Sequence, residues 1–177
     1  LSMTMSTGTA LSPGTITLLG NSNFSVQNFV AGGYVVQSGD YYLNIAGNLL
    51  CNSGNMTLTT GTLNFNGALT QTIQNGNGLF TAYDLRCNTG SDVETSSNFT
   101  ISDDLLIGGT GSFEASFGTV TMTGTSNLID NDEGTVKFYS LTIDGTAASI
   151  TADNFSVKDD FTIGADDTFA QADGFTA

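Results

Sequence analysis

The chain has 177 residues, of which only 11% are charged, and its formal net charge is −14 because it contains three basic residues and no histidine. Phosphates and anionic lipid surfaces repel such a chain, so nucleic acid is excluded as a partner, as is an anionic membrane surface. The hydrophobic fraction of 39% is sufficient for a folded core, and no run approaches the ~20 apolar residues of a membrane helix, so a disordered chain and membrane insertion are also excluded.

The charges are distributed unevenly along the chain. Residues 1–83 carry one charged side chain, Asp40, whereas residues 84–177 carry sixteen acids and all three bases. Charged side chains normally keep a folded surface soluble. The first half is therefore either covered by a partner subunit or by sugar, or kept soluble by its Asn, Thr and Ser residues alone. Both interpretations stay open.

From residue 14 onwards, short segments of alternating apolar and polar residues follow one another. This period of two predicts strands with one buried face, and the Gly-, Asn- and Asp-rich steps between them predict turns. The strongest inward pairs are Leu49/Cys51, Leu63/Phe65, Leu85/Cys87, Leu105/Ile107, Val120/Met122, Leu141/Ile143 and Phe161/Ile163. No helical periodicity is present, so we predict an all-β protein with repeats over 14–177, preceded by an N-terminal segment or short cap over 1–13.

The alternating segments recur at long range. Residues 98–108 reappear as residues 154–164, and residues 83–87 reappear as residues 139–143, both at an offset of 56. The inward pairs that begin at 85, 105, 120 and 141 divide this offset into steps of 20, 15 and 21 residues. We therefore predict a parallel β-helix, or β-solenoid, with about 19 residues per coil and three coils per 56-residue repeat.

Two cysteines test this prediction. Cys51 aligns with Ile107 and Cys87 with Ile143, so both are expected to face inward as small hydrophobic residues. In the predicted solenoid they lie two coils apart in one column, about 10 Å from each other. A disulfide requires Cα atoms within about 7 Å. We therefore expect two free, buried thiols.

The repeats resemble those of large secreted surface proteins of bacteria and archaea. The resemblance lies in residues 61–67, 70–73 and 80–87, then Val93 and residues 99–107. It implies a β-solenoid of the adhesin or autotransporter-passenger kind, located outside the cell or on its surface. These motifs determine a fold and do not specify a function.

Two groups of acids are candidate cation ligands. Asp130, Asp132 and Glu133 lie in the densest acidic run and resemble part of a Ca²⁺ loop, although the distal ligands of a complete loop are missing. The pairs Asp103-Asp104 and Asp159-Asp160 recur at one repeat position. We interpret these pairs as polar bends between strands, and the run as an acidic turn. We therefore expect no cofactor, with Ca²⁺ as the single alternative.

Four Asn-x-Ser/Thr sequons are candidate glycosylation sites: Asn23, Asn55, Asn98 and Asn154. Two of them, Asn98 and Asn154, are equivalent in the repeat. In a chain so rich in Asn and Thr, several such sequons arise by chance.

The sequence does not predict an enzyme, because it has no His for a triad, no Zn cluster and no phosphate loop. A solenoid has open ends, and the repeat begins by residue 14. Two explanations fit: the chain is a segment of a longer solenoid, or its ends join other subunits head to tail. We therefore expect an extracellular structural protein, a subunit of a cell-surface filament that joins copies of itself head to tail. One alternative is an adhesin-type surface protein that binds a glycan or a host receptor. A carbohydrate-active β-helix enzyme is a more distant alternative.

Overall fold

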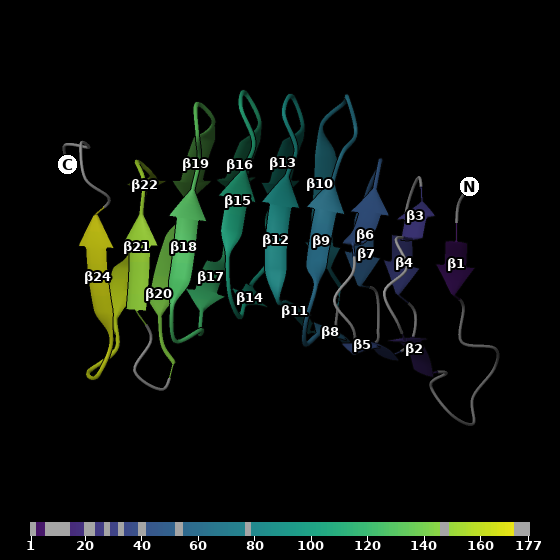
Figure 1. Ribbon diagram of the computed structural model, residues 1–177, viewed down its shortest axis with the longest axis horizontal. Helices are drawn as coiled ribbons and strands as arrows, with labels where there is room; N and C mark the ends of the chain where they lie inside the picture. Colours follow the sequence, from purple (N-terminus) through teal and green to yellow (C-terminus); the bar gives the residue numbers. More distant parts are fainter. Residues whose placement is uncertain are drawn as a thin grey trace.

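The computed structural model is a three-sided parallel β-solenoid (Figure 1). It describes residues 3–5, 15–19, 24–26, 29–31, 34–38, 42–51, 55–76, 79–145 and 149–171, with side chains from residue 42 onwards except those of 149 and 150. Within these ranges every regular element is a strand and none is a helix. The predicted fold class is therefore confirmed.

The chain visits three sheets in strict rotation, one strand at a time, so that each sheet has eight strands within the described part. Sheet A consists of β1 (Met3–Met5), β4 (Phe29–Ala31), β7 (Leu49–Cys51), β10 (Gln71–Asn75), β13 (Asp92–Thr95), β16 (Ser112–Ala115), β19 (Thr135–Phe138) and β22 (Ser156–Val157). Sheet B consists of β2 (Thr15–Leu19), β5 (Tyr34–Ser38), β8 (Met56–Leu58), β11 (Phe80–Ala82), β14 (Phe99–Ile101), β17 (Thr119–Met122), β20 (Ser140–Ile143) and β23 (Phe161–Ile163). Sheet C consists of β3 (Phe24–Val26), β6 (Tyr42–Ile45), β9 (Thr62–Phe65), β12 (Asp84–Cys87), β15 (Leu105–Ile107), β18 (Asn127–Asp130), β21 (Ser149–Ala152) and β24 (Thr168–Gln171).

One turn of the solenoid is longer than the sequence predicted. Along sheet B the register joins, turn after turn, Thr57, Thr81, Thr100, Thr121, Thr142 and Thr162. The successive steps are 24, 19, 21, 21 and 20 residues, so a turn takes about 21 residues instead of 19. The corners absorb the variation, because the strands themselves differ little in length.

The 56-residue repeat is not three coils. It carries β12 onto β20 and β15 onto β23, which means eight strands, and hence two and two-thirds turns. Each repeat therefore moves an equivalent strand from sheet C to sheet B, or from sheet B to sheet A, as for β14 and β22. The sequence did not reveal this shift, because strands of all three sheets point a similar apolar pair inward.

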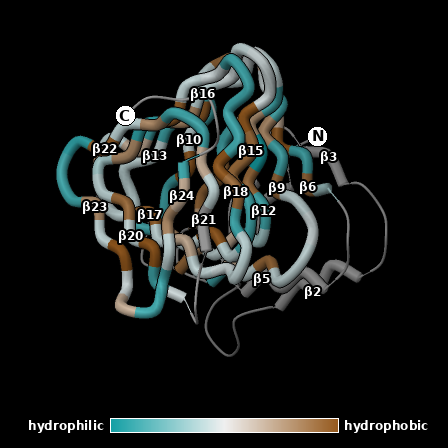
Figure 2. The backbone as a smooth tube through the Cα atoms, turned by 60° about the vertical axis from the view of Figure 1, so that its left-hand side comes forward, coloured by the Kyte–Doolittle hydropathy of each residue, from teal (hydrophilic) through white to brown (hydrophobic). Residues whose placement is uncertain are grey.

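The inward residues form one continuous core, and apolar and polar residues alternate along the strands (Figure 2). The core includes a chain of neighbouring aromatic rings with centroids 5.4–6.1 Å apart, from Phe80 through Phe99, Phe113 and Phe138 to Phe155. Each ring belongs to a different turn or corner, so the chain of rings ties together successive turns through edge-to-face and tilted contacts. Stacking, not any single turn, creates this core.

Both cysteines are free and buried, as predicted, but for a different geometric reason. Cys51 lies in β7 of sheet A and Cys87 in β12 of sheet C, so they do not share a column. Burial raises the pKa of the Cys51 thiol to about 12 and also raises that of Cys87 above its ordinary value. Both behave as small core residues.

One predicted inward pair is not buried. Phe161 and Ile163 of β23 are 41% and 42% exposed, whereas their repeat equivalents Leu105 and Ile107 are 0% and 2% exposed. Within the described part of the chain, β23 pairs only with β20, because it is the last strand of sheet B. An inward-facing side chain is fully covered only when another turn is stacked on each side of its own turn.

The segment 1–13, predicted to precede the repeats, contributes β1 to sheet A, where Met3 pairs with Phe29. The division of the chain at residue 13 otherwise stays a prediction.

Candidate functional site

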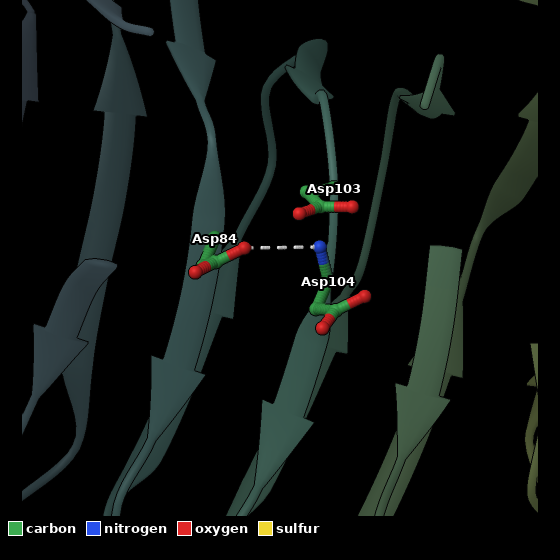
Figure 3. A group of neighbouring side chains, drawn as sticks. All are labelled: Asp84, Asp103 and Asp104. Carbon is green, nitrogen blue, oxygen red and sulfur yellow. Dashed lines mark hydrogen bonds between the residues drawn. The ribbon is translucent and has the colours of Figure 1, made fainter. Parts of the chain in front are cut away.

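Three carboxylates meet at the corner where sheet B passes into sheet C. Asp84 begins β12, and Asp103 and Asp104 precede β15 in the next turn (Figure 3). One oxygen of each lies within 4.8 Å of the others, and all three side chains are partly buried. Oxygen ligands at such distances are the kind that Ca²⁺ prefers.

Two of these carboxylates have structural partners in neighbouring turns. Asp84 Oδ1 accepts a hydrogen bond from the Asp104 backbone N–H at 3.3 Å (Figure 3). Its Oδ2 accepts one from Thr62 Oγ1 at 3.2 Å. Asp104 Oδ1 accepts in turn from the Leu128 N–H at 2.9 Å. Each acid thus joins its own turn to the next turn. At these corners the backbone N–H of the next turn lacks a β-sheet partner, and the carboxylate accepts its hydrogen bond.

The corner is electrostatically unfavourable for three negative charges. Desolvation, and then the neighbouring acids, raise the pKa of Asp84 and of Asp104, although hydrogen bonds from the backbone partly offset this. The pKa of Tyr83 is raised first by its hydrogen bond to Asp103 and then by the charge of that carboxylate. Burial and like charges disfavour the ionised form of each group.

The repeat equivalent of this corner lacks the third carboxylate. Asp159 and Asp160 occupy the places of Asp103 and Asp104, and they make the same backbone hydrogen bonds with Tyr139 and Leu141 that the first pair makes with Tyr83 and Leu85. Ser140 stands where the triad has Asp84. This geometry agrees with the interpretation of both pairs as bends between strands.

The run that was predicted as a partial Ca²⁺ loop lies at another corner, between sheets C and A. Asp130 ends β18, and Asp132 and Glu133 are exposed in the turn that follows. Asp130 Oδ1 accepts from the Asp132 N–H at 3.2 Å, and Asp132 Oδ2 accepts from the Gly109 N–H at 3.4 Å. Among the described residues, Asp84, Asp103 and Asp104 form a group of three carboxylates within 4.8 Å of one another, whereas the acids of this run do not.

The described sequon asparagines also lie at corners. Asn55 Oδ1 accepts from the Leu79 N–H at 3.1 Å, and Asn98 Oδ1 accepts from the Thr119 N–H at 2.8 Å. Asn154 is exposed, and Asn23 lies outside the described residues. Sequence reasoning missed this role, in which a corner Asn joins two turns. Glycosylation at these sites stays a prediction.

Searches for related proteins returned no match: no family model, no curated protein and no solved structure matches the chain. No helix among the described residues is long and apolar enough to span a membrane. Proposals about function therefore depend on the geometry of the solenoid and on the resemblance of its repeats.

Proposed function

We propose that the protein is an extracellular structural element, a subunit of a cell-surface filament that stacks end to end on other copies of itself. Its placement outside the cell follows from the resemblance of its repeats to those of surface proteins. The end-to-end contact is suggested by the exposure of Phe161 and Ile163, the inward pair of the last described turn of sheet B.

The last described turn has the chemistry of an interior turn. Phe161 lies edge-on to Phe155 at 5.9 Å and to Phe169 at 5.4 Å, so the aromatic chain of the core continues up to this end. Strands β22, β23 and β24 each pair on one side only within the described part. One further turn of the same kind would bury the apolar side chains and pair the free strand edges. We propose that a second copy supplies this turn.

Such a contact joins the end of one copy to the start of another. A heterologous contact of this type does not close on itself and produces a filament. A net charge of −14 on each copy opposes it, so assembly should increase with ionic strength as salt screens the repulsion.

Electron microscopy and sedimentation of the purified chain test the proposal. Thin fibres of uniform width, more abundant at high salt, are the expected result. The variant Ile163→Lys places a charge on the exposed end and should leave the chain monomeric. The matched control Thr162→Lys carries the same charge outward on the same strand and should assemble normally. A wild-type chain that stays monomeric at high concentration and high salt contradicts the proposal.

A further inference from the structure

One of the three outer faces of the solenoid differs in charge from the other two. The eight described sheet B strands read TITLL, YVVQS, MTL, FTA, FTI, TVTM, SLTI and FTI, and none of them contains a charged residue. The strands of sheet A carry Asp92, Glu94, Glu114 and Lys137, and those of sheet C carry Asp84, Arg86 and Asp130. A neutral face on a chain of net charge −14 is suited to a neutral partner.

Hydroxyl groups recur on this face in the six successive strands from β8 to β23. The outward threonine column of sheet B runs without interruption from Thr57 to Thr162. Successive members lie one strand spacing apart, about 4.8 Å. Each hydroxyl can both donate and accept a hydrogen bond. The face therefore offers a regular row of uncharged polar groups along the solenoid axis.

A groove of about 230 Å³ follows part of this row. It crosses β11, β14 and β17 and lies between the threonine column and the adjoining corner, and its lining includes Leu79, Thr81, Asn98, Thr100, Thr119 and Thr121. Asn98 is exposed, and its Oδ1 accepts a hydrogen bond from the Thr119 N–H. The buried Phe80 and Phe99 also line the groove, so it combines amide and hydroxyl groups with the exposed Leu79 and an apolar floor.

Exposed apolar side chains mark the corner beside the groove. Leu79 is 71% exposed, and Phe117, two turns further along the same corner, is 61% exposed and stacks on Tyr139 with ring centroids 5.1 Å apart. Flat apolar surfaces next to hydrogen-bonding groups suit a ligand that has apolar faces and hydroxyl edges. Pyranose rings have both features.

We propose that the outer face of sheet B binds a neutral polysaccharide chain, which lies along the solenoid axis in this groove. The negative charge of the molecule disfavours acidic polysaccharides. Cationic partners would bind the acidic corners of sheet C in preference to this neutral face. This proposal goes beyond end-to-end assembly and does not depend on it, because the groove lies on the side of the solenoid and is complete within a single chain.

Two binding assays test the proposal. They measure retention of the purified chain on insoluble cellulose and chitin, and its retardation in gels that contain dextran, with polygalacturonate as the anionic comparison. Binding to at least one neutral polysaccharide and none to polygalacturonate is expected. Thr100→Lys fills the groove and should weaken binding at least tenfold. Thr135→Lys, the same change on an exposed position of sheet A, should leave it unchanged. Circular dichroism and melting confirm that both variants are folded.

A second pair of variants probes the apolar contact. Leu79→Ala should weaken binding several-fold, whereas Leu69→Ala, which truncates an 81% exposed leucine at another corner, should not.

Three results overturn the proposal. The first is the absence of retention on all the neutral polysaccharides. The second is retention that Thr100→Lys does not reduce. The third concerns a chain that binds no polysaccharide but associates with itself or shapes ice crystals. If Thr100→Lys abolishes that activity, the face binds another copy of the chain or ordered water instead.

Discussion

The turn that contains β15 and the turn that contains β23 carry the same sequence motif in two different surroundings. Ile107 and Ile163 occupy equivalent positions 56 residues apart, yet the first is 2% exposed and the second 42% exposed. β15 has a strand on both sides, and β23 has one neighbour in the described part. The motif therefore specifies which way a side chain points, and the neighbouring turn determines whether it is buried.

This comparison separates local from cooperative stability. In a solenoid, each turn is stabilised mainly by its contacts with adjacent turns. A residue in a central turn stabilises two interfaces, whereas a residue in β23 has one neighbouring strand within the described part of the chain. The same substitution should therefore have very different costs at the two places.

The largest effect is expected from alanine substitutions at this matched pair. Ile107→Ala removes a fully packed side chain and should lower the free energy of unfolding by about 2–5 kcal/mol. Ile163→Ala removes a side chain that is already partly hydrated and should cost roughly 1 kcal/mol, in proportion to its smaller buried area. Urea unfolding followed by circular dichroism gives both values. Equal losses would show that the last turn is covered.

Thiol reactivity provides a second measure of the same contrast. Cys51 and Cys87 lie in interior turns, and burial holds the pKa of Cys51 near 12, so neither thiol should react with a disulfide reagent at pH 8 unless the protein opens. A cysteine introduced by Ile163→Cys should react at once. Rapid modification of the native thiols in folded protein would contradict the interior placement of β7 and β12.

Acidification should stabilise the corner formed by β12 and β15. The pKa values of Asp84 and Asp104 are raised in the folded state above the ordinary value of 3.8, so the folded protein binds protons more tightly than the unfolded chain. The contribution of these two groups to stability therefore increases as the pH falls through their raised pKa values towards 3.8, and decreases as the pH rises through the same window. Melting temperatures of Asp84→Asn and wild-type protein across this range measure the difference, which should narrow on acidification.

The smallest effect is expected at Asp103. Replacement by Asn removes one of three neighbouring charges while keeping an acceptor for Tyr83, and should raise the stability at pH 7 by about 0.5–1 kcal/mol. Asp159→Asn should change the stability at pH 7 less, because Ser140 stands there in place of the third carboxylate. The like-charge explanation would be contradicted if Asp103→Asn were less stable than wild-type protein, if EDTA lowered the stability of the wild-type protein, and if added Ca²⁺ left the variant unchanged.

Much of the fold follows from the sequence, because a period of two and a long-range repeat together predict stacked parallel strands. The sequence could not reveal which sheet each strand joins, since Leu85/Cys87 in sheet C and Leu141/Ile143 in sheet B have the same inward pattern. The error in the placement of the cysteines has the same origin.

The acidic triad was only partly predictable. Asp103 and Asp104 stand out as a recurring pair, but Asp84 has no acidic equivalent in the repeat, and it meets the pair only through the register between β12 and β15. The threonine column was also hidden, because its members lie 19–24 residues apart and corners of unequal length separate them. Register between turns is a tertiary property that local patterns do not specify.

The sequence repeat covers eight strands, whereas the solenoid has three sheets, so equivalent residues of successive repeats lie on different faces. Because eight is not a multiple of three, a side chain that occurs once per repeat moves to a different face each time and returns to its first face only after three repeats. Duplication of this unit therefore distributes a feature in a spiral around the rod. A row on one face, such as the threonines of sheet B, requires separate selection of residues at non-equivalent repeat positions.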